Sequence, residues 1–139
     1  MVLQIKPQTL LNNMLIRMLE YTIGIKPMAG KVKPEIIVAD VANYESLSEM
    51  AAVSKVIITT VGPYTRYGEP LVKACIEKKC DYVDLVGEPN FVDEIRYRHH
   101  EKAKEAGVKI INACGFDSIP HDLGVLFTVN KLREKFSPE

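Results

Sequence analysis

The sequence predicts an α/β fold in which a parallel sheet is flanked by helices. From residue 35 onward, short β-branched runs alternate with amphipathic stretches, and a glycine or polar residue follows each run. Strands that are joined by helices form parallel sheets through right-handed crossovers. The chain has 139 residues and an apolar fraction of 47%, which is enough for one domain with a buried core.

The first expected strand covers residues 36–39 and ends at Asp40. Asn43 follows as a good N-cap, because its side chain can accept hydrogen bonds from the free amides of a helix start. The helix after it carries its apolar residues on one side, at Tyr44, Leu47, Met50 and Ala51. The second expected strand is the β-branched run 55–61, whose residue types suit a half-buried sheet.

A Gly62-Pro63 turn ends the second strand, and a helix should follow it. We expect that helix to begin near Gly68, with Pro70 in its first turn, where a proline costs no hydrogen bond. Lysines near its other end suit the negative pole of the helix dipole.

The third expected strand covers residues 82–86 and ends at Gly87. Asn90 is the expected N-cap of the next helix, and Gly107 is expected to end it. Between them, apolar spacing predicts a buried stripe made of Phe91, Val92, Ile95, His99, Ala103 and Ala106.

The fourth expected strand covers residues 108–114 and ends at Gly115, and a final helical segment follows it toward a polar tail. Residues 8–21 show a separate amphipathic pattern that favours a helix docked on a sheet over a helix on a membrane surface. The chain thus divides into an N-terminal helical segment, 1–34, a strand–helix region, 35–130, and a polar tail, 131–139.

Four expected strand ends, at Asp40, Gly62, Gly87 and Gly115, should lie along one edge, because all strands of a parallel sheet run the same way. Ligands of open α/β sheets bind at this carboxyl edge. Glycine in such turns allows a ligand to approach the backbone closely. The edge is therefore the expected binding site.

Three side chains near this edge are candidates for catalysis. Glu88 could bind a hydroxyl or act as a base, but it could equally be a solvated residue before a helix. His121 could act as an acid or base, and Tyr64 is the third candidate. Asp117 and Ser118 are more simply interpreted as caps of the last helix.

The composition argues against several classes of protein. Lys and Arg total 18, as do Asp and Glu, whereas nucleic-acid-binding proteins carry a basic excess. The three cysteines, Cys75, Cys80 and Cys114, lack the spacing of metal ligands and indicate reduced thiols in an intracellular protein. No metal site is expected, and no apolar run is long enough to span a bilayer.

Several strings together resemble the saccharopine dehydrogenase-like oxidoreductase family. The resemblance covers roughly residues 35–128 and includes animal members and bacterial trans-acting enoyl reductases. Its motifs are Val61-Gly62-Pro63-Tyr64, Tyr67-Gly68-Glu69-Pro70-Leu71-Val72-Lys73-Ala74-Cys75, Gly87-Glu88-Pro89 and Ala113-Cys114-Gly115-Phe116-Asp117-Ser118-Ile119-Pro120.

That resemblance implies a Rossmann-type domain that binds NAD or NADP in the full-length parent. It implies that the loops Gly62-Pro63-Tyr64 and Gly115-Phe116-Asp117 lie by the nicotinamide half of the cofactor. In such an arrangement Asp40 could contact the adenine end, although it could equally cap the following turn. The resemblance also implies association with lipid droplets or membranes and a role in lipid or glycolipid metabolism.

The glycine-rich loop that would bind the cofactor's pyrophosphate is missing. No G-x-G-x-x-G string occurs in the chain, and the sequence aligns as if the family's first two strands were absent. The expected fold is therefore a partial Rossmann-type parallel sheet. Strands 36–39 and 55–61 should be separated from each other, which leaves 55–61 as an edge strand.

Two functional hypotheses remain open at this point. The chain is either a fragment of an NAD(P)-dependent oxidoreductase or a non-catalytic interaction or membrane-associated module that retains part of the fold. Whether the chain is itself an enzyme is left open, but alone it should be inactive and should not bind NAD(P) with useful affinity. The expected partner is a second copy of the chain or the missing N-terminal segment.

Overall fold

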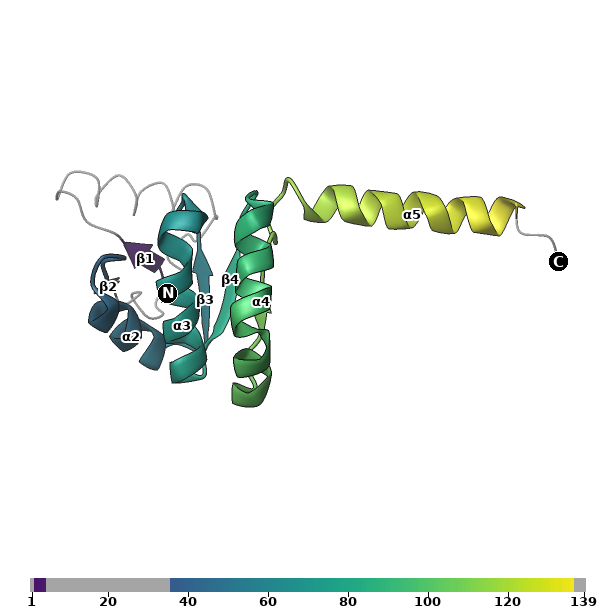
Figure 1. Ribbon diagram of the computed structural model, residues 1–139. Helices are drawn as coiled ribbons and strands as arrows, with labels where there is room; N and C mark the ends of the chain where they lie inside the picture. The colour runs from purple at the N-terminus through teal and green to yellow at the C-terminus, as the bar shows by residue number, and fades with distance from the viewer. Residues whose placement is uncertain (1, 5–35, 137–139) are drawn as a thin grey trace, which may run out of the picture.

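The computed structural model describes residues 2–4 and 36–136, which form an α/β fold with a projecting C-terminal helix (Figure 1). The strands are β1 (Val2–Gln4), β2 (Ile36–Val38), β3 (Val56–Thr59), β4 (Asp81–Asp84) and β5 (Ile110–Ile111). The helices are α2 (Tyr44–Ala52), α3 (Tyr64–Lys78), α4 (Pro89–Ala106) and α5 (Ile119–Phe136).

The described strands form two parallel sheets. In one, β1 pairs with β2; in the other, the strand order is β3-β4-β5. The expected separation of the first and second predicted strands is therefore confirmed, because β2 and β3 lie in different sheets. Strand β1 lies in the segment 1–34, so that residues 2–4 are extended rather than helical. The helix expected over residues 8–21 lies outside the described residues.

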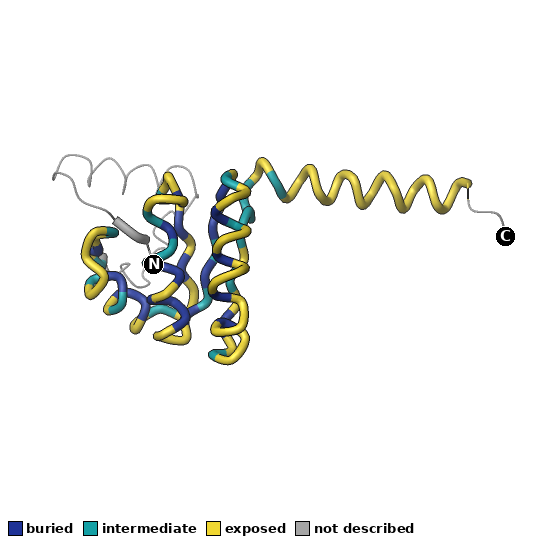
Figure 2. Tube along the Cα trace, in the orientation of Figure 1, coloured by how far each residue is buried: buried dark blue, intermediate teal, exposed yellow. Residues whose placement is uncertain are grey.

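One face of the β3-β4-β5 sheet makes the core with α3 and α4. Side chains alternate between the two faces of a strand, and Ile57 of β3 and Tyr82 of β4 are buried neighbours on the covered face. Phe91 and Ile95 of α4 and Val72 of α3 complete the apolar interior. Figure 2 shows the buried residues gathered along the inner sides of these helices and strands.

Helices α3 and α4 approach each other closely at Gly68. A Cβ atom added to Gly68 would lie 2.5 Å from the ring tip of Phe91. The absence of a side chain at this position therefore lets the Phe91 ring pack against the α3 backbone, beside the ring of Tyr64 at a centroid distance of 5.8 Å.

The expected start of α2 and the expected C-terminal end of α4 are confirmed. The Asn43 side chain accepts hydrogen bonds from the amides of Glu45 and Ser46, as predicted for an N-cap. Gly107 ends α4 with a φ of 71°, in the left-handed region that glycine adopts without strain.

Two predicted helix starts are wrong. Helix α3 begins at Tyr64, so that Pro70 lies inside it rather than in its first turn. Helix α4 begins at Pro89 with Glu88 as its N-cap residue, and Asn90 lies in the first turn. Pro89 has the φ angle that a first helical residue requires, and this fixes the start before Asn90 can cap it.

Helix α5 projects away from the rest of the molecule (Figure 1). It has no buried residue, and it continues through Phe136, so that residues 131–136 of the predicted tail are helical. Within the described ranges, no helix combines the length and the hydropathy that crossing a bilayer would require.

Candidate functional site

The carboxyl ends of β3, β4 and β5 meet at one edge of their sheet, as the sequence predicts for three of the four strand ends. Hydrogen bonds connect the turns that follow these strands. The Cys114 amide donates to the Asp84 carbonyl oxygen at 2.8 Å, and the Tyr64 amide donates to the Glu88 carboxylate at 2.8 Å. The turns after three separate strands thus form one continuous rim.

Glu88 joins the turn after β4 to the start of α3. Its carboxylate accepts hydrogen bonds from the amides of Tyr64 and Thr65, at 2.8 and 2.9 Å, and from the Thr65 hydroxyl at 2.7 Å. The hydroxyl bond, followed by the two amide bonds, lowers the pKa of Glu88. The carboxylate is therefore held ionised at the positive end of a helix dipole. In this state it caps α3 and has little capacity to take a proton from a substrate.

Asp84 is the buried polar centre of the rim, and sequence reasoning did not identify it. One carboxylate oxygen accepts bonds from the amides of Val86 and Ala113, at 3.1 and 2.9 Å. The other accepts bonds from the Tyr82 hydroxyl at 2.9 Å and the Asn112 side-chain amide at 2.7 Å. Four donors on a 2% exposed carboxylate indicate a structural role in joining the ends of β4 and β5.

Tyr64 lies inside the rim rather than on its surface. Its side chain is 5% exposed, and its hydroxyl donates to the Thr59 carbonyl oxygen at 3.1 Å. Burial raises the pKa of the Tyr64 phenol. The phenol therefore stays protonated and braces β3 at physiological pH.

The turn Gly115-Phe116-Asp117 leads from β5 into α5. Gly115 packs closely on the residue that follows β4, since a Cβ atom there would lie 2.8 Å from the Leu85 Cβ. Phe116 is 82% exposed, and Asp117 is also exposed. His121 lies in the first turn of α5 with an exposed side chain. The three candidate catalytic residues thus take different positions: Tyr64 is buried, Glu88 caps a helix, and His121 is on α5.

Asp40 lies apart from this rim, at the end of β2 in the other sheet. Its carboxylate accepts a hydrogen bond from the Ala42 amide at 2.9 Å, and its carbonyl oxygen accepts one from the Asn43 amide. Asp40 was a candidate either for contact with the adenine end of a cofactor or for capping the following turn. These contacts correspond to the capping role.

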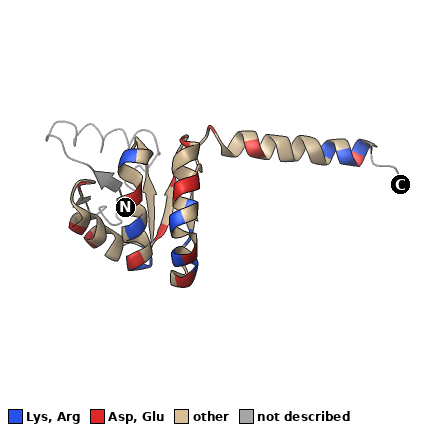
Figure 3. Ribbon diagram, in the orientation of Figure 1, with Lys and Arg blue, Asp and Glu red and all other residues tan. Residues whose placement is uncertain are grey.

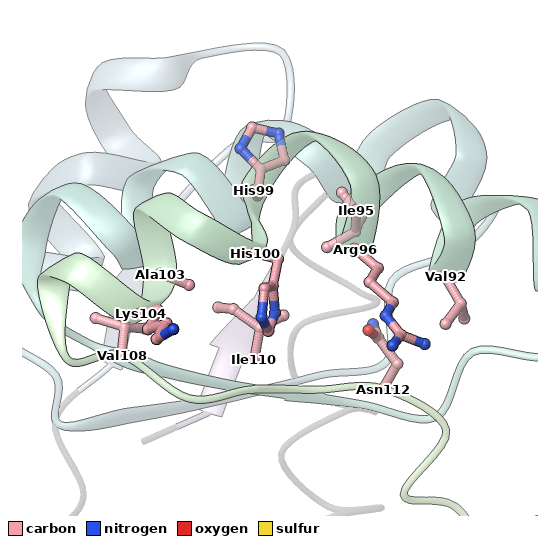
Figure 4. A pocket seen from close by; sticks show the side chains of 10 residues that line it. All are labelled: Val92, Ile95, Arg96, His99, His100, Ala103, Lys104, Val108, Ile110 and Asn112. Carbon is pink, nitrogen blue, oxygen red and sulfur yellow. The ribbon is translucent and has the colours of Figure 1, made fainter.

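A groove of about 400 Å³ lies between α4 and β5 and reaches Asn112 at the carboxyl edge (Figure 4). Its lining is partly apolar, with Ile95 and Ile110, and partly basic, with Arg96 and Lys104. Figure 4 shows His100 pointing toward Ile110, whereas His99 points to the opposite side of α4. There its Nε2 atom lies 2.9 Å from a Glu69 carboxylate oxygen of α3. His99 therefore packs between helices, as the sequence predicts.

The parallel sheet, the helical crossovers and the rim of glycine-bearing turns define a Rossmann-type α/β domain. The model of the family described as "Saccharopine dehydrogenase NADP binding domain" matches residues 21–111. The chain belongs to this family.

The relatives that this chain matches are longer than the chain itself. The chain is 52% identical over 97 residues to the human saccharopine dehydrogenase-like oxidoreductase, covering 70% of the chain and 23% of that protein. It is 49% identical over 92 residues to a Caenorhabditis elegans lipid droplet localized protein, covering 66% of the chain and 22% of that protein.

A solved structure has the same fold over most of the chain. It is the apo saccharopine dehydrogenase (L-Glu forming) of Saccharomyces cerevisiae, with a TM-score of 0.59 and 24% identity. The match covers 70% of this chain and 21% of that one. The chain thus spans about a quarter or less of the length of the proteins that it matches.

The described residues fit only part of the cofactor that the family name implies. At Gly87 an added Cβ atom would meet nothing within 4 Å, so the backbone there is open to a flat ring. The amides at the start of α3, however, are already bound to the Glu88 carboxylate, which would also repel a phosphate. The rim is therefore accessible at Gly87, whereas the start of α3 is not free to bind a phosphate.

Among the described residues, no group of three or more His, Cys, Asp or Glu side chains could hold a metal ion. Cys75 and Cys80 are both fully buried. Burial raises the pKa of both thiols. These cysteines therefore have the properties of core residues rather than nucleophiles.

Proposed function

We propose that this chain supplies the nicotinamide-facing rim of an NAD(P)-dependent oxidoreductase. The observation that carries the proposal is the hydrogen-bonded rim made by the turns after β3, β4 and β5. It lies at the edge where open α/β sheets bind their ligands, in a chain of an NADP-binding domain family. The pyrophosphate site and the catalytic residues would come from protein segments other than the described residues.

The substrate of the parent oxidoreductase is proposed to be a lipid or glycolipid. The support is the name of the Caenorhabditis elegans relative, which places that protein at lipid droplets. Flotation of the tagged chain on a density gradient of cell lysate tests whether it associates with lipid droplets. Recovery with the lipid droplet fraction is expected, and recovery only in the other fractions would count against it.

A second candidate function is a non-catalytic interaction module that retains part of the fold. The observation that favours it is α5, an 18-residue helix without a buried side chain. Exposed apolar residues on such a helix suit contact with another macromolecule.

Backbone amide NMR spectra of the chain, titrated separately with the two halves of the cofactor, test the leading proposal. Reduced nicotinamide mononucleotide should bind weakly, with a Kd of roughly 1 mM or above, and should shift the amides of Gly62, Gly87 and Gly115. The other half, 2′-phospho-ADP-ribose, should cause no comparable shifts.

Gly87→Val provides the matched test, because its new side chain would enter the open space where the ring approaches. It should abolish the nicotinamide-dependent shifts. Gly124→Val, at an equally open position on α5, should leave them intact. Shifts that cluster outside the rim, or that persist in Gly87→Val, would refute the proposal.

A further inference from the structure

The face of the β3-β4-β5 sheet opposite α3 and α4 carries exposed apolar side chains. Val56 and Ile58 of β3 are 46% and 68% exposed, Leu85 after β4 is 49% exposed, and Ile111 of β5 is 47% exposed. The strand register places Ile58 and Ile111 on either side of Val83, so these residues form one continuous surface. Parallel sheets are normally covered by helices on both faces.

Helix α5 is the second uncovered apolar surface of the same chain. Val125, Val129, Leu132 and Phe136 follow one another at intervals of four, three and four residues, which places them in one stripe along the helix. Their exposed fractions lie between 36% and 67%. This spacing is typical of a helix that packs along a protein surface.

The distribution of residues on α5 favours a protein partner over a lipid surface. A helix that lies on a membrane has one apolar face and one strongly charged face. Helix α5 has a second apolar stripe, with Leu123 and Phe127, on a different side. Its basic residues are confined to its C-terminal part, as Figure 3 shows.

We infer that α5 of one copy covers the open sheet face of a second copy, and that two copies exchange their α5 helices. Helix α5 leads away from its own sheet directly after the Gly115 turn, so that it presents its stripe to another molecule (Figure 1). Reciprocal exchange about a two-fold axis would cover both sheet faces and both stripes at once.

The apolar area is sufficient for a stable dimer. The four exposed residues of the sheet face and the four of the stripe are about half exposed on average. With roughly 120 Å² of apolar surface on each side chain, they offer on the order of 500 Å² per copy. A standard protein–protein interface buries about 800 Å² per partner, of which somewhat more than half is apolar.

Sedimentation velocity of the full chain between about 1 and 100 μM tests this inference. The wild-type chain should sediment as a dimer at the upper concentrations. Leu132→Glu, on the stripe, and Ile58→Glu, on the sheet face, should each sediment as monomers. Both positions are at least half exposed, and unchanged circular dichroism would establish that each variant folds.

Lys131→Glu is the matched control, because residue 131 is next to Leu132 in sequence but lies about 100° from it around the helix, off the stripe, and this variant should remain dimeric. An equimolar mixture of Leu132→Glu and Ile58→Glu should regain dimer, because one α5–sheet contact in the pair is intact. A wild-type monomer at 100 μM, with the face covered by residues 8–21 or by its own α5, would overturn the inference. So would an Ile58→Glu dimer, which would indicate pairing of α5 helices alone.

Discussion

At the scale of single residues, the rim depends on a few buried groups whose partners are distant in sequence. Asp84 receives bonds from residues two positions away on either side and from residues 28 and 29 positions away. In the sequence it is one acidic residue in an apolar strand, and no local pattern indicates what it binds. Candidate residues of the rim could be located from the turns, but the roles of Asp84, Tyr64 and Glu88 required the tertiary structure.

We expect Asp84→Asn to lower the free energy of unfolding by about 3 kcal/mol. The substituted amide group would face donors, and at least one buried donor would lose its partner. Urea unfolding followed by circular dichroism measures the change. Asp81→Asn, at the half-buried start of the same strand, is the control; its amide oxygen can still accept the bond from the Lys109 amide, so it should cost less than about 1 kcal/mol. Equal effects of the two substitutions would contradict the role given to Asp84.

Gly68→Ala should destabilise the chain by about 1–3 kcal/mol, although alanine normally favours a helix. The reason is the 2.5 Å approach of the new Cβ atom to the buried Phe91 ring. Gly124→Ala, in open space on α5, should instead be neutral or stabilising by up to about 1 kcal/mol. Thermal unfolding of both variants measures whether their stabilities change in opposite directions. A Gly68→Ala variant more stable than wild type would contradict the prediction.

At the scale of elements, the sequence predicts which segments form helices and strands better than it predicts where they begin. Asn43 and Gly107 were identified correctly because capping is a local interaction. The start of α3 was placed four residues late, because its cap is the carboxylate of Glu88, which lies 24 residues further along the chain. Pro70, which suggested a first turn, is accommodated inside the helix.

The contact between α3 and α4 should weaken in acid. Hydrogen bonding from His99, followed by contributions from Lys73 and Arg98, holds the pKa of Glu69 below its ordinary value of 4.5. A lowered pKa means that the carboxylate stabilises the fold above pH 4.5, and that this stabilisation is lost as the pH falls through the lowered value.

Glu69→Gln should therefore lower the free energy of unfolding by about 1 kcal/mol at pH 7, and the difference from wild type should shrink below pH 4.5. Urea unfolding at pH 7 and pH 3.5 measures it. Glu94→Gln removes an exposed partner of Arg98 only and should change stability by less than about 0.5 kcal/mol. A difference for Glu69→Gln that stays constant with pH would contradict this account.

At the scale of the whole molecule, the sequence predicted an α/β fold with parallel strands and the separation of β2 from β3. It did not predict the pairing of β1 with β2, because three residues are too few for a recognisable strand pattern. The placement of Asp40 with the other strand ends assumed one sheet, whereas the described strands form two. Which strands pair depends on contacts between distant segments rather than on local pattern.

The central claim is that the chain carries the nicotinamide-facing rim of an NAD(P)-binding fold, and that its described residues form no site for the pyrophosphate. Titration of NADPH with the chain, followed by the fluorescence of the reduced nicotinamide, tests it most directly, because the chain contains no tryptophan to interfere. The account predicts no saturation up to about 100 μM chain, since the described residues offer none of the phosphate contacts that provide most of the affinity. Saturable binding with a micromolar Kd would contradict it.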